Sequence, residues 1–186
     1  MRIISGRFRG RRLNTCTGPG YRPATGKVRE SLFSILESSG INWQGARVLD
    51  LFAGSGALGF EALSRGAEYA LLIEKNRNAV NTLKKNLRDL DLAKDTCRVL
   101  AKDVLAFLNK PGDNPFDIVF IDPPYRLNML QPTLKSLVNK GWVTSGSLIQ
   151  AEIESELPTP TMESLIPVRE KLYGQTKVCL WKKRSI

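Results

Sequence analysis

The 186-residue chain contains no histidine and only three cysteines. Without histidine, Ser–His and Cys–His nucleophilic catalysis are excluded, and a catalytic transition-metal site is not expected. Cys16, Cys97 and Cys179 lie far apart without CxxC spacing, so neither a disulfide framework nor a zinc site is indicated.

Long apolar runs are also missing. No stretch reaches the roughly 18 apolar residues that span a bilayer, and the start, MRIISGRFRGRRL, lacks the apolar core of a signal peptide. We therefore expect a cytoplasmic protein without a membrane partner. Hydrophobic residues still make up 42% of the chain and charged residues 25%, which is typical of a globular domain with its own core.

Acidic residues are scarce, 18 against 28 basic ones, which gives a net charge of +10. Residues 1–30 contain eight basic side chains and a single acid. A segment with charge of one sign indicates a polyanionic partner, most often a nucleic acid, although a solvated surface is the alternative. The candidate nucleic-acid contacts are Arg7, Arg9, Arg11, Arg12, Arg22, Lys27 and Arg29.

The order of predicted elements indicates an α/β fold. Residues 1–22 predict a short hairpin in which Arg7, Arg9 and Arg11 share one face of a strand, and residues 27–36 predict a helix. Strands then alternate with helices, and two final strands joined at Gly174 predict an antiparallel pair at one edge. We expect a seven-stranded, mainly parallel, Rossmann-like sheet with helices on both faces.

The expected strands cover residues 46–54, 69–74, 97–101, 116–122, 146–153 and the two parts of 168–181. The predicted helices between them cover 57–65, 76–90, 104–108 and 130–138. We divide the chain into a basic N-terminal extension, residues 1–40, and a catalytic domain, residues 41–186.

A glycine-rich turn, GSGALG, follows the first expected strand of the domain. Its GxGxxG spacing fits a dinucleotide, but Asp50 stands just before it, where a carboxylate would repel a pyrophosphate. The sulfonium and amino groups of S-adenosylmethionine suit that position better. Glu74 could accept the ribose hydroxyls, and Asp103 either the adenine amino group or, as a helix cap, backbone N–H groups. The cofactor-binding candidates are Asp50, Phe52, Ala53, Gly54, Ser55, Gly56, Glu74, Lys75, Asp103 and Val104.

The sequence IDPPY ends the fourth expected strand of the domain. The Asp122 carboxylate and the Pro123 carbonyl can each accept one hydrogen of an NH2 group, which increases electron density on an otherwise poor nucleophile. The two prolines hold these acceptors rigidly, and Tyr125 can stack on an extruded base. The catalytic candidates are Asp122, Pro123, Pro124 and Tyr125. Together the two motifs predict an S-adenosylmethionine-dependent amino-methyltransferase.

Four segments, RIISGRFRGRRL, RPATGKVRESLFSIL, VLDLFAGSGALGFEALSRGA and IDPPY, occur in an order that resembles the bacterial RsmD family. The resemblance covers nearly the whole chain and implies a class I methyltransferase that modifies the guanine N2 amine at position 966 of 16S rRNA. It implies a partly assembled small ribosomal subunit as partner, a monomeric enzyme, and no metal. Gly26 departs from the family, which is expected to have an aspartate there.

Other functions remain open from the sequence. The same chemistry could methylate adenine or cytosine amines in DNA, or a glutamine in a protein. A non-catalytic RNA-binding protein and a nicotinamide oxidoreductase are alternatives from other classes.

Overall fold

The computed structural model describes residues 1–16, 25–124 and 128–185. The helices are α1 (Gly26–Ser38), α2 (Ala57–Arg65), α3 (Arg77–Asp89), α4 (Val104–Leu108) and α5 (Leu130–Asn139). The strands are β1 (Arg47–Leu51), β2 (Tyr69–Glu74), β3 (Cys97–Ala101), β4 (Phe116–Ile121), β5 (Val143–Glu154), β6 (Leu165–Tyr173) and β7 (Thr176–Lys183). No helix in these ranges is both long and apolar enough to cross a membrane.

The strands form one seven-stranded sheet in the order β3-β2-β1-β4-β5-β7-β6. Strands β1 to β5 pair in parallel, whereas β7 pairs antiparallel with both β5 and β6. The parallel part follows from the helices between successive strands, since a parallel neighbour needs a crossover connection. The predicted fold is confirmed, including the antiparallel pair joined at Gly174.

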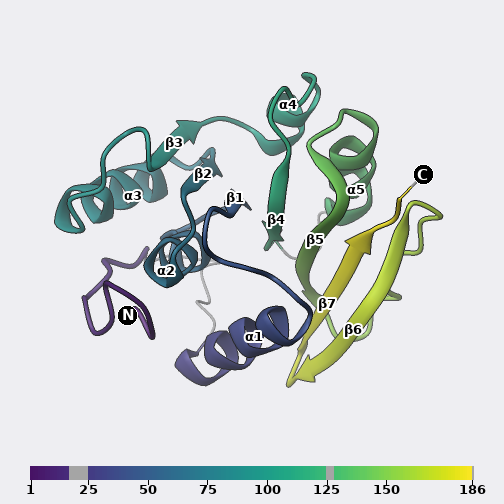
Figure 1. Ribbon diagram of the computed structural model, residues 1–186, viewed down its shortest axis with the longest axis horizontal. Helices are drawn as coiled ribbons and strands as arrows, with labels where there is room; N and C mark the ends of the chain where they lie inside the picture. The colour runs from purple at the N-terminus through teal and green to yellow at the C-terminus, as the bar shows by residue number, and fades with distance from the viewer. Residues whose placement is uncertain (17–24, 125–127, 186) are drawn as a thin grey trace.

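Helices cover both faces of the sheet. In Figure 1, α1, α2 and α3 lie on one side and α4 and α5 on the other. Successive residues of a strand point to opposite faces, so Val48 of β1 packs in the cluster under α1 and α2, while Leu49 packs in the cluster under α4 and α5. Burial on both faces explains why the central strands are almost continuously apolar.

The N-terminal segment, residues 1–16, forms the predicted hairpin only at its two ends. Arg2 and Arg12 form an antiparallel bridge, the Ile3 N–H donates to the Arg11 carbonyl, and residues 5–10 form bends and turns instead of strand. Gly6 and Gly10 have φ angles of 77° and 81°, which bend the chain away from an extended strand. The Arg7 N–H donates to the Ser64 carbonyl of α2 instead of to a partner strand. The basic side chains of this segment therefore do not line one face of a strand.

Glu61 of α2 fixes this segment to the domain. Its carboxylate is fully buried and accepts the N–H groups of Ile4 and Ser5 at 2.7 and 3.0 Å. A second link joins Asn14 to Asn86 of α3, whose side chain both accepts the Asn14 N–H and donates to the Asn14 carbonyl. The segment consequently lies beside α2 and α3, as Figure 1 shows.

Candidate active site at the carboxyl edge of the sheet

The candidate site lies where the strand order changes direction. After β1 the chain continues to β2 and β3 on one side, and β4 and β5 lie on the other side of β1. Ligands of open α/β sheets bind at such a switch point, outside the carboxyl ends of the strands. The glycine turn after β1 and the Asp-Pro-Pro sequence after β4 therefore meet at the same edge.

The glycine turn has an unusual backbone that its sequence makes possible. Phe52, Gly54 and Gly56 have φ angles of 60°, 54° and 78°. A Cβ atom on Gly56 would lie 2.4 Å from Cε2 of Phe60, so no larger residue fits there without movement. The turn brings its backbone N–H groups and the start of α2 to the strand edge, where they can face a ligand.

Two side chains from neighbouring elements hold this turn. The Glu74 carboxylate at the end of β2 accepts the Gly54 N–H at 3.0 Å and the Asn76 N–H at 2.8 Å. From α3, the buried Asn86 amide donates to the Ser55 carbonyl at 3.0 Å. Glu74 retains free lone pairs for a ligand's hydroxyl groups. Asn86 was not anticipated, because an Asn within a polar helix gives no sequence signal of its own.

Asp50 lies inside β1, beneath the start of α2. Its side chain is 3% exposed, and Oδ2 accepts the Gly59 N–H at 3.0 Å. Burial raises the pKa of the Asp50 carboxyl to about 8, with smaller contributions from the charges of Asp122 and Glu74 and against the opposing effect of the Gly59 N–H. A positively charged group nearby would favour the ionised form of this carboxyl.

Asp103 acts as the cap of α4. Its Oδ1 accepts the N–H groups of Leu105 and Ala106, and Oδ2 lies 3.4 Å from the Lys75 ammonium. The helix cap that the sequence allowed for this residue is therefore present, and its contact with the cofactor stays a prediction. Val104 differs from the prediction, because it is 3% exposed within the core under α4 and α5 rather than presented to a ligand.

Asp122 follows β4 directly. Because β4 pairs with β1 on one side and β5 on the other, Asp122 lies between the ends of these two strands. Solvent reaches the Asp122 side chain, yet the surrounding protein atoms disfavour its charge and raise its pKa to about 6. Pro123 is buried and Pro124 is exposed. Tyr125, the predicted stacking residue, lies outside the described residues.

Glu152 of β5 is a further acid at this edge, and sequence reasoning missed it. The register pairs Ile121 with Ala151, so the next residues along the two strands, Asp122 and Glu152, are neighbours. Glu152 is 8% exposed, and burial together with the Asp122 charge raises its pKa to about 8. An acid inside the otherwise apolar run SLIQAEI was the signal that could have identified it.

The described residues contain no cluster of three or more Asp, Glu or Cys side chains that could hold a metal ion. Four carboxyl groups, those of Asp50, Glu74, Asp122 and Glu152, nevertheless gather at one edge of a protein with a net charge of +10. Three of them have raised pKa values, which is typical of functional sites. A cationic ligand would favour the ionised forms of these carboxyl groups.

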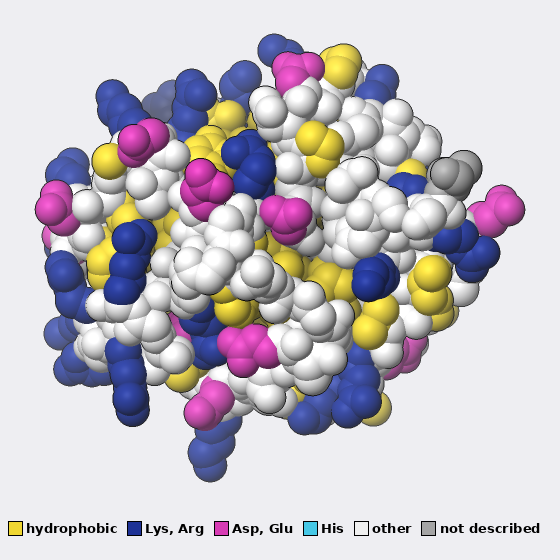
Figure 2. All heavy atoms as spheres, viewed as in Figure 1, with side chains coloured by type: hydrophobic (Ala, Val, Ile, Leu, Met, Phe, Trp, Pro, Cys, Tyr) yellow, Lys and Arg dark blue, Asp and Glu magenta, His cyan; other side chains and the backbone are white. Residues whose placement is uncertain are grey.

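A basic face lies beside α2 and α3. Four predicted contacts of the N-terminal segment are exposed, and α3 adds exposed basic side chains that the sequence did not single out. Figure 2 shows dark blue side chains gathered on the side of the molecule where Figure 1 places this segment and α3. We define the basic face as Arg7, Arg9, Arg11, Arg12, Lys84, Lys85 and Arg88. Lys27 is also exposed, at the start of α1, whereas Arg22 lies outside the described residues.

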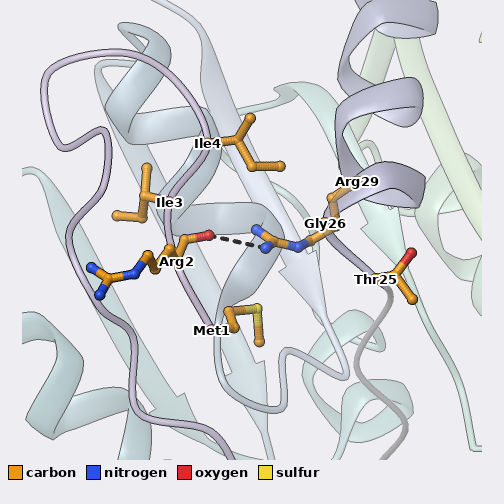
Figure 3. A pocket seen from close by; sticks show the side chains of 7 residues that line it. All are labelled: Met1, Arg2, Ile3, Ile4, Thr25, Gly26 and Arg29. Carbon is orange, nitrogen blue, oxygen red and sulfur yellow. Dashed lines mark hydrogen bonds between the residues drawn. The ribbon is translucent and has the colours of Figure 1, made fainter.

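Arg29 differs from the prediction of a nucleic-acid contact. The side chain is 4% exposed, donates to the Arg2 carbonyl at 3.0 Å and lies 3.9 Å from Glu61. Figure 3 shows its guanidinium pointing toward the N-terminal segment, in a pocket of about 510 Å³ also lined by Met1 and Ile4. The first turns of α1 pack against that segment and cover Arg29. Its side chain therefore links α1 to the N-terminal segment instead of facing solvent.

The fold and the two strand-end motifs are those of a class I, Rossmann-like methyltransferase. The family model described as "Conserved hypothetical protein 95" matches residues 1–182. The chain belongs to this family, which is the RsmD family that the sequence motifs resemble.

Relatives and solved structures agree with this assignment. The chain is 43% identical to ribosomal RNA small subunit methyltransferase D of Escherichia coli, covering 100% of this chain and 91% of that protein. It is 37% identical to the protein of the same name from Haemophilus influenzae, covering 94% and 89% of the two chains. A solved Escherichia coli structure, yhhF, superimposes with a TM-score of 0.87 at 41% identity, covering 100% of this chain and 99% of that one. A Thermus thermophilus protein gives a TM-score of 0.81 at 33% identity, covering 98% and 99%.

Proposed function

We propose that this protein transfers the methyl group of S-adenosylmethionine to the N2 amine of a guanine in 16S rRNA, at position 966. The observation that carries the proposal is the meeting of the glycine turn after β1 with Asp122 and Pro123 after β4 at the switch point of the sheet. One motif suits the cofactor and the other suits an amine, and they lie on adjacent strands.

The residues at the turn fit S-adenosylmethionine. Glycine at position 56 lets the turn pack directly on Phe60, which keeps its backbone at the strand edge, and Glu74 offers lone pairs to hydroxyl groups. Asp50 supplies a buried carboxyl next to the turn, which complements positive charge on the ligand better than a pyrophosphate. When bound, the cofactor supplies a methyl group on a positively charged sulfur, which leaves as a neutral thioether.

Asp122 and Pro123 prepare the amine. The Asp122 carboxylate accepts one N–H hydrogen and the Pro123 carbonyl accepts the other, so the nitrogen lone pair is directed away from both acceptors. Rigid acceptors of this kind need no reorganisation during the reaction. Once nitrogen carries a fourth bond, its surplus proton lies on the hydrogen bond to Asp122 and passes from there to solvent.

The basic face supports an RNA substrate. Arg7, Arg9 and Arg12 are exposed on a segment that Glu61 and Asn86 fix against α2 and α3, so phosphate contacts there would orient RNA on the domain. The two relatives described above are named for methylation of small-subunit ribosomal RNA. We extend that substrate to this chain, with a partly assembled small subunit as the particle and a monomer as the active form.

The test is methyl transfer to unmodified small ribosomal subunits with isotope-labelled S-adenosylmethionine. We expect label in N2-methylguanosine after nuclease digestion and mass spectrometry. The variant Asp122→Ala should abolish transfer while cofactor affinity, measured by calorimetry, stays near the wild-type value. Label on adenine, cytosine or protein, or no label at all, would refute the assignment. RNA binding with full biological function in Asp122→Ala would favour a non-catalytic RNA-binding protein.

A further inference from the structure

The carboxyl end of β5 presents polar groups that the methyl-transfer chemistry does not use. Gln150 and Glu152 alternate with Ile149, Ala151 and Ile153, which pack in the core under α4 and α5. Gln150 and Glu152 therefore point to the other face, toward α1. On that face Phe33 of α1 packs on Phe120 with ring centroids 6.0 Å apart.

The amide of Gln150 is both buried and unsatisfied. Its side chain is 0% exposed, and neither Nε2 nor Oε1 has a hydrogen-bond partner within the described residues. Leaving a buried donor and acceptor unpaired costs free energy, so the fold gains nothing from this amide by itself. A ligand that brings its own polar atoms to this place would satisfy it.

The register places these groups next to the amine acceptor. Phe120 pairs with Gln150 and Ile121 with Ala151, so Glu152 and Asp122 follow at the same level on adjacent strands. Adjacent strands lie about 4.8 Å apart, which allows equivalent side chains to reach neighbouring atoms of one flat ring. Figure 1 shows β4 and β5 side by side at this edge of the sheet.

Among the substrates that carry a conjugated NH2 group, guanine is distinguished by what lies next to that group. Adenine and cytosine have an unprotonated ring nitrogen beside their amine, and a glutamine amide has a carbonyl oxygen. Guanine instead has the N1–H donor beside N2, followed by the O6 acceptor. An acceptor placed next to the amine acceptors is therefore complementary to guanine in particular.

We propose that Glu152 is a specificity-determining residue that accepts the N1–H of the target guanine while Asp122 and Pro123 accept the hydrogens of N2. The inference rests on the proposed function and adds to it the group that selects the base. Gln150 lies two residues earlier on the same face, where its amide is buried without a partner beneath the proposed base position. A donor at this place favours the ionised form of Glu152, and a carboxylate accepts a hydrogen bond more strongly than a neutral amide oxygen does.

The experiment pairs a change in the protein with a change in the base. Wild type, Glu152→Gln and the exposed control Glu163→Gln are assayed on small subunits reconstituted with rRNA that carries either guanine or 2-aminopurine at the target position. 2-Aminopurine keeps the N2 amine but has an acceptor at N1 and no oxygen at position 6. Cofactor affinity and thermal unfolding of each variant are measured alongside.

For wild type we expect kcat/KM on 2-aminopurine to be about 10- to 100-fold lower than on guanine, the loss typical of a hydrogen bond to a charged group. Glu152→Gln should lose activity on guanine by a similar factor and should narrow the difference between the bases, because its amide can turn an N–H toward N1. Glu163→Gln should behave as wild type, and cofactor affinity should stay unchanged throughout.

Three results would overturn the inference. In the first, wild type methylates guanine and 2-aminopurine equally. This result would count against base selection by Glu152 even if the Glu152→Gln variant does not fold. Glu152→Gln could retain full activity on guanine, or it could lose activity equally on both bases and so keep the wild-type preference, as expected of a purely structural role. A wild type that transfers no methyl group to RNA would instead refute the proposed function itself.

Discussion

Removal of the Glu61 carboxylate should destabilise the whole domain. Glu61 is fully buried, holds two N–H groups of the N-terminal segment, and accepts from Arg65 Nε at 3.0 Å. It is also the acid nearest to the buried guanidinium of Arg29, at 3.9 Å. Burial lowers the pKa of Arg29, whereas the Glu61 charge raises it, so the pair is coupled.

The magnitude follows from the groups that Glu61→Ala leaves behind. Breaking a buried ion pair by removing one partner costs about 3 to 5 kcal/mol, because the other charge stays buried without compensation. For a chain of 186 residues, that loss corresponds to a decrease in Tm of about 6 to 20 °C. Thermal unfolding followed by far-ultraviolet circular dichroism measures it. The exposed acid Glu68 provides the control, because Glu68→Ala makes the same charge change with an expected effect within about 0.5 kcal/mol.

A second substitution tests the cause. In the wild-type background Arg29→Met should destabilise the protein, because it leaves Glu61 with one partner fewer. In the Glu61→Ala background the same substitution should stabilise it, since it removes the uncompensated charge. A Glu61→Ala protein that melts within about 2 °C of wild type, or an Arg29→Met effect of the same sign in both backgrounds, would refute the reasoning.

Other predictions concern the site and the basic face. Gly56→Ala should weaken cofactor binding measured by calorimetry, because its Cβ would overlap Phe60, whereas Gly26→Ala meets no atom within 4 Å and should leave binding unchanged. The pKa of Asp50 rises from 3.8 to about 8 on folding, so the folded state holds more protons between these values and stability falls as pH rises through that window. Between about pH 6 and pH 8.5, the Tm of wild type should therefore decrease more than the Tm of Asp50→Asn. Parallel plots of Tm against pH for the two proteins would contradict this. RNA affinity should fall steeply as the salt concentration rises. Arg9→Ala should lower both the affinity and its dependence on salt, whereas the control Lys135→Ala on α5 should change neither. An affinity that does not change with salt would exclude phosphate contacts.

Much of the architecture could be predicted from the sequence. Segments such as YALLIE and CRVLA are short, apolar and bounded by polar residues, and they form strands with the predicted limits. Gly66, with a φ angle of 122°, ends α2 as its position predicted. Because strands and helices alternate, the carboxyl ends of the parallel strands had to share one edge, which brings Gly54 and Asp122 to the same side of the sheet.

Local patterns were less informative where a side chain's surroundings come from distant parts of the chain. Basic residues in the first part of the chain suggested one RNA-binding surface, but Arg29 is turned inward by Glu61, which lies in another helix. Alternation predicted a strand for Arg7, Arg9 and Arg11, but two glycines and hydrogen bonds to α2 produce turns instead.

The sequence alone thus determined the order of strands and helices, the glycine turn and the Asp-Pro-Pro terminus, because these depend on local backbone preferences and on apolar periodicity. The tertiary structure decided which charges are buried and which acids become neighbours. Glu152 lies beside Asp122 only because β4 and β5 pair in a particular register, and Asn86 holds the glycine turn only because α3 packs against it. Burial and proximity are properties of the packed chain, so no window of sequence contains them.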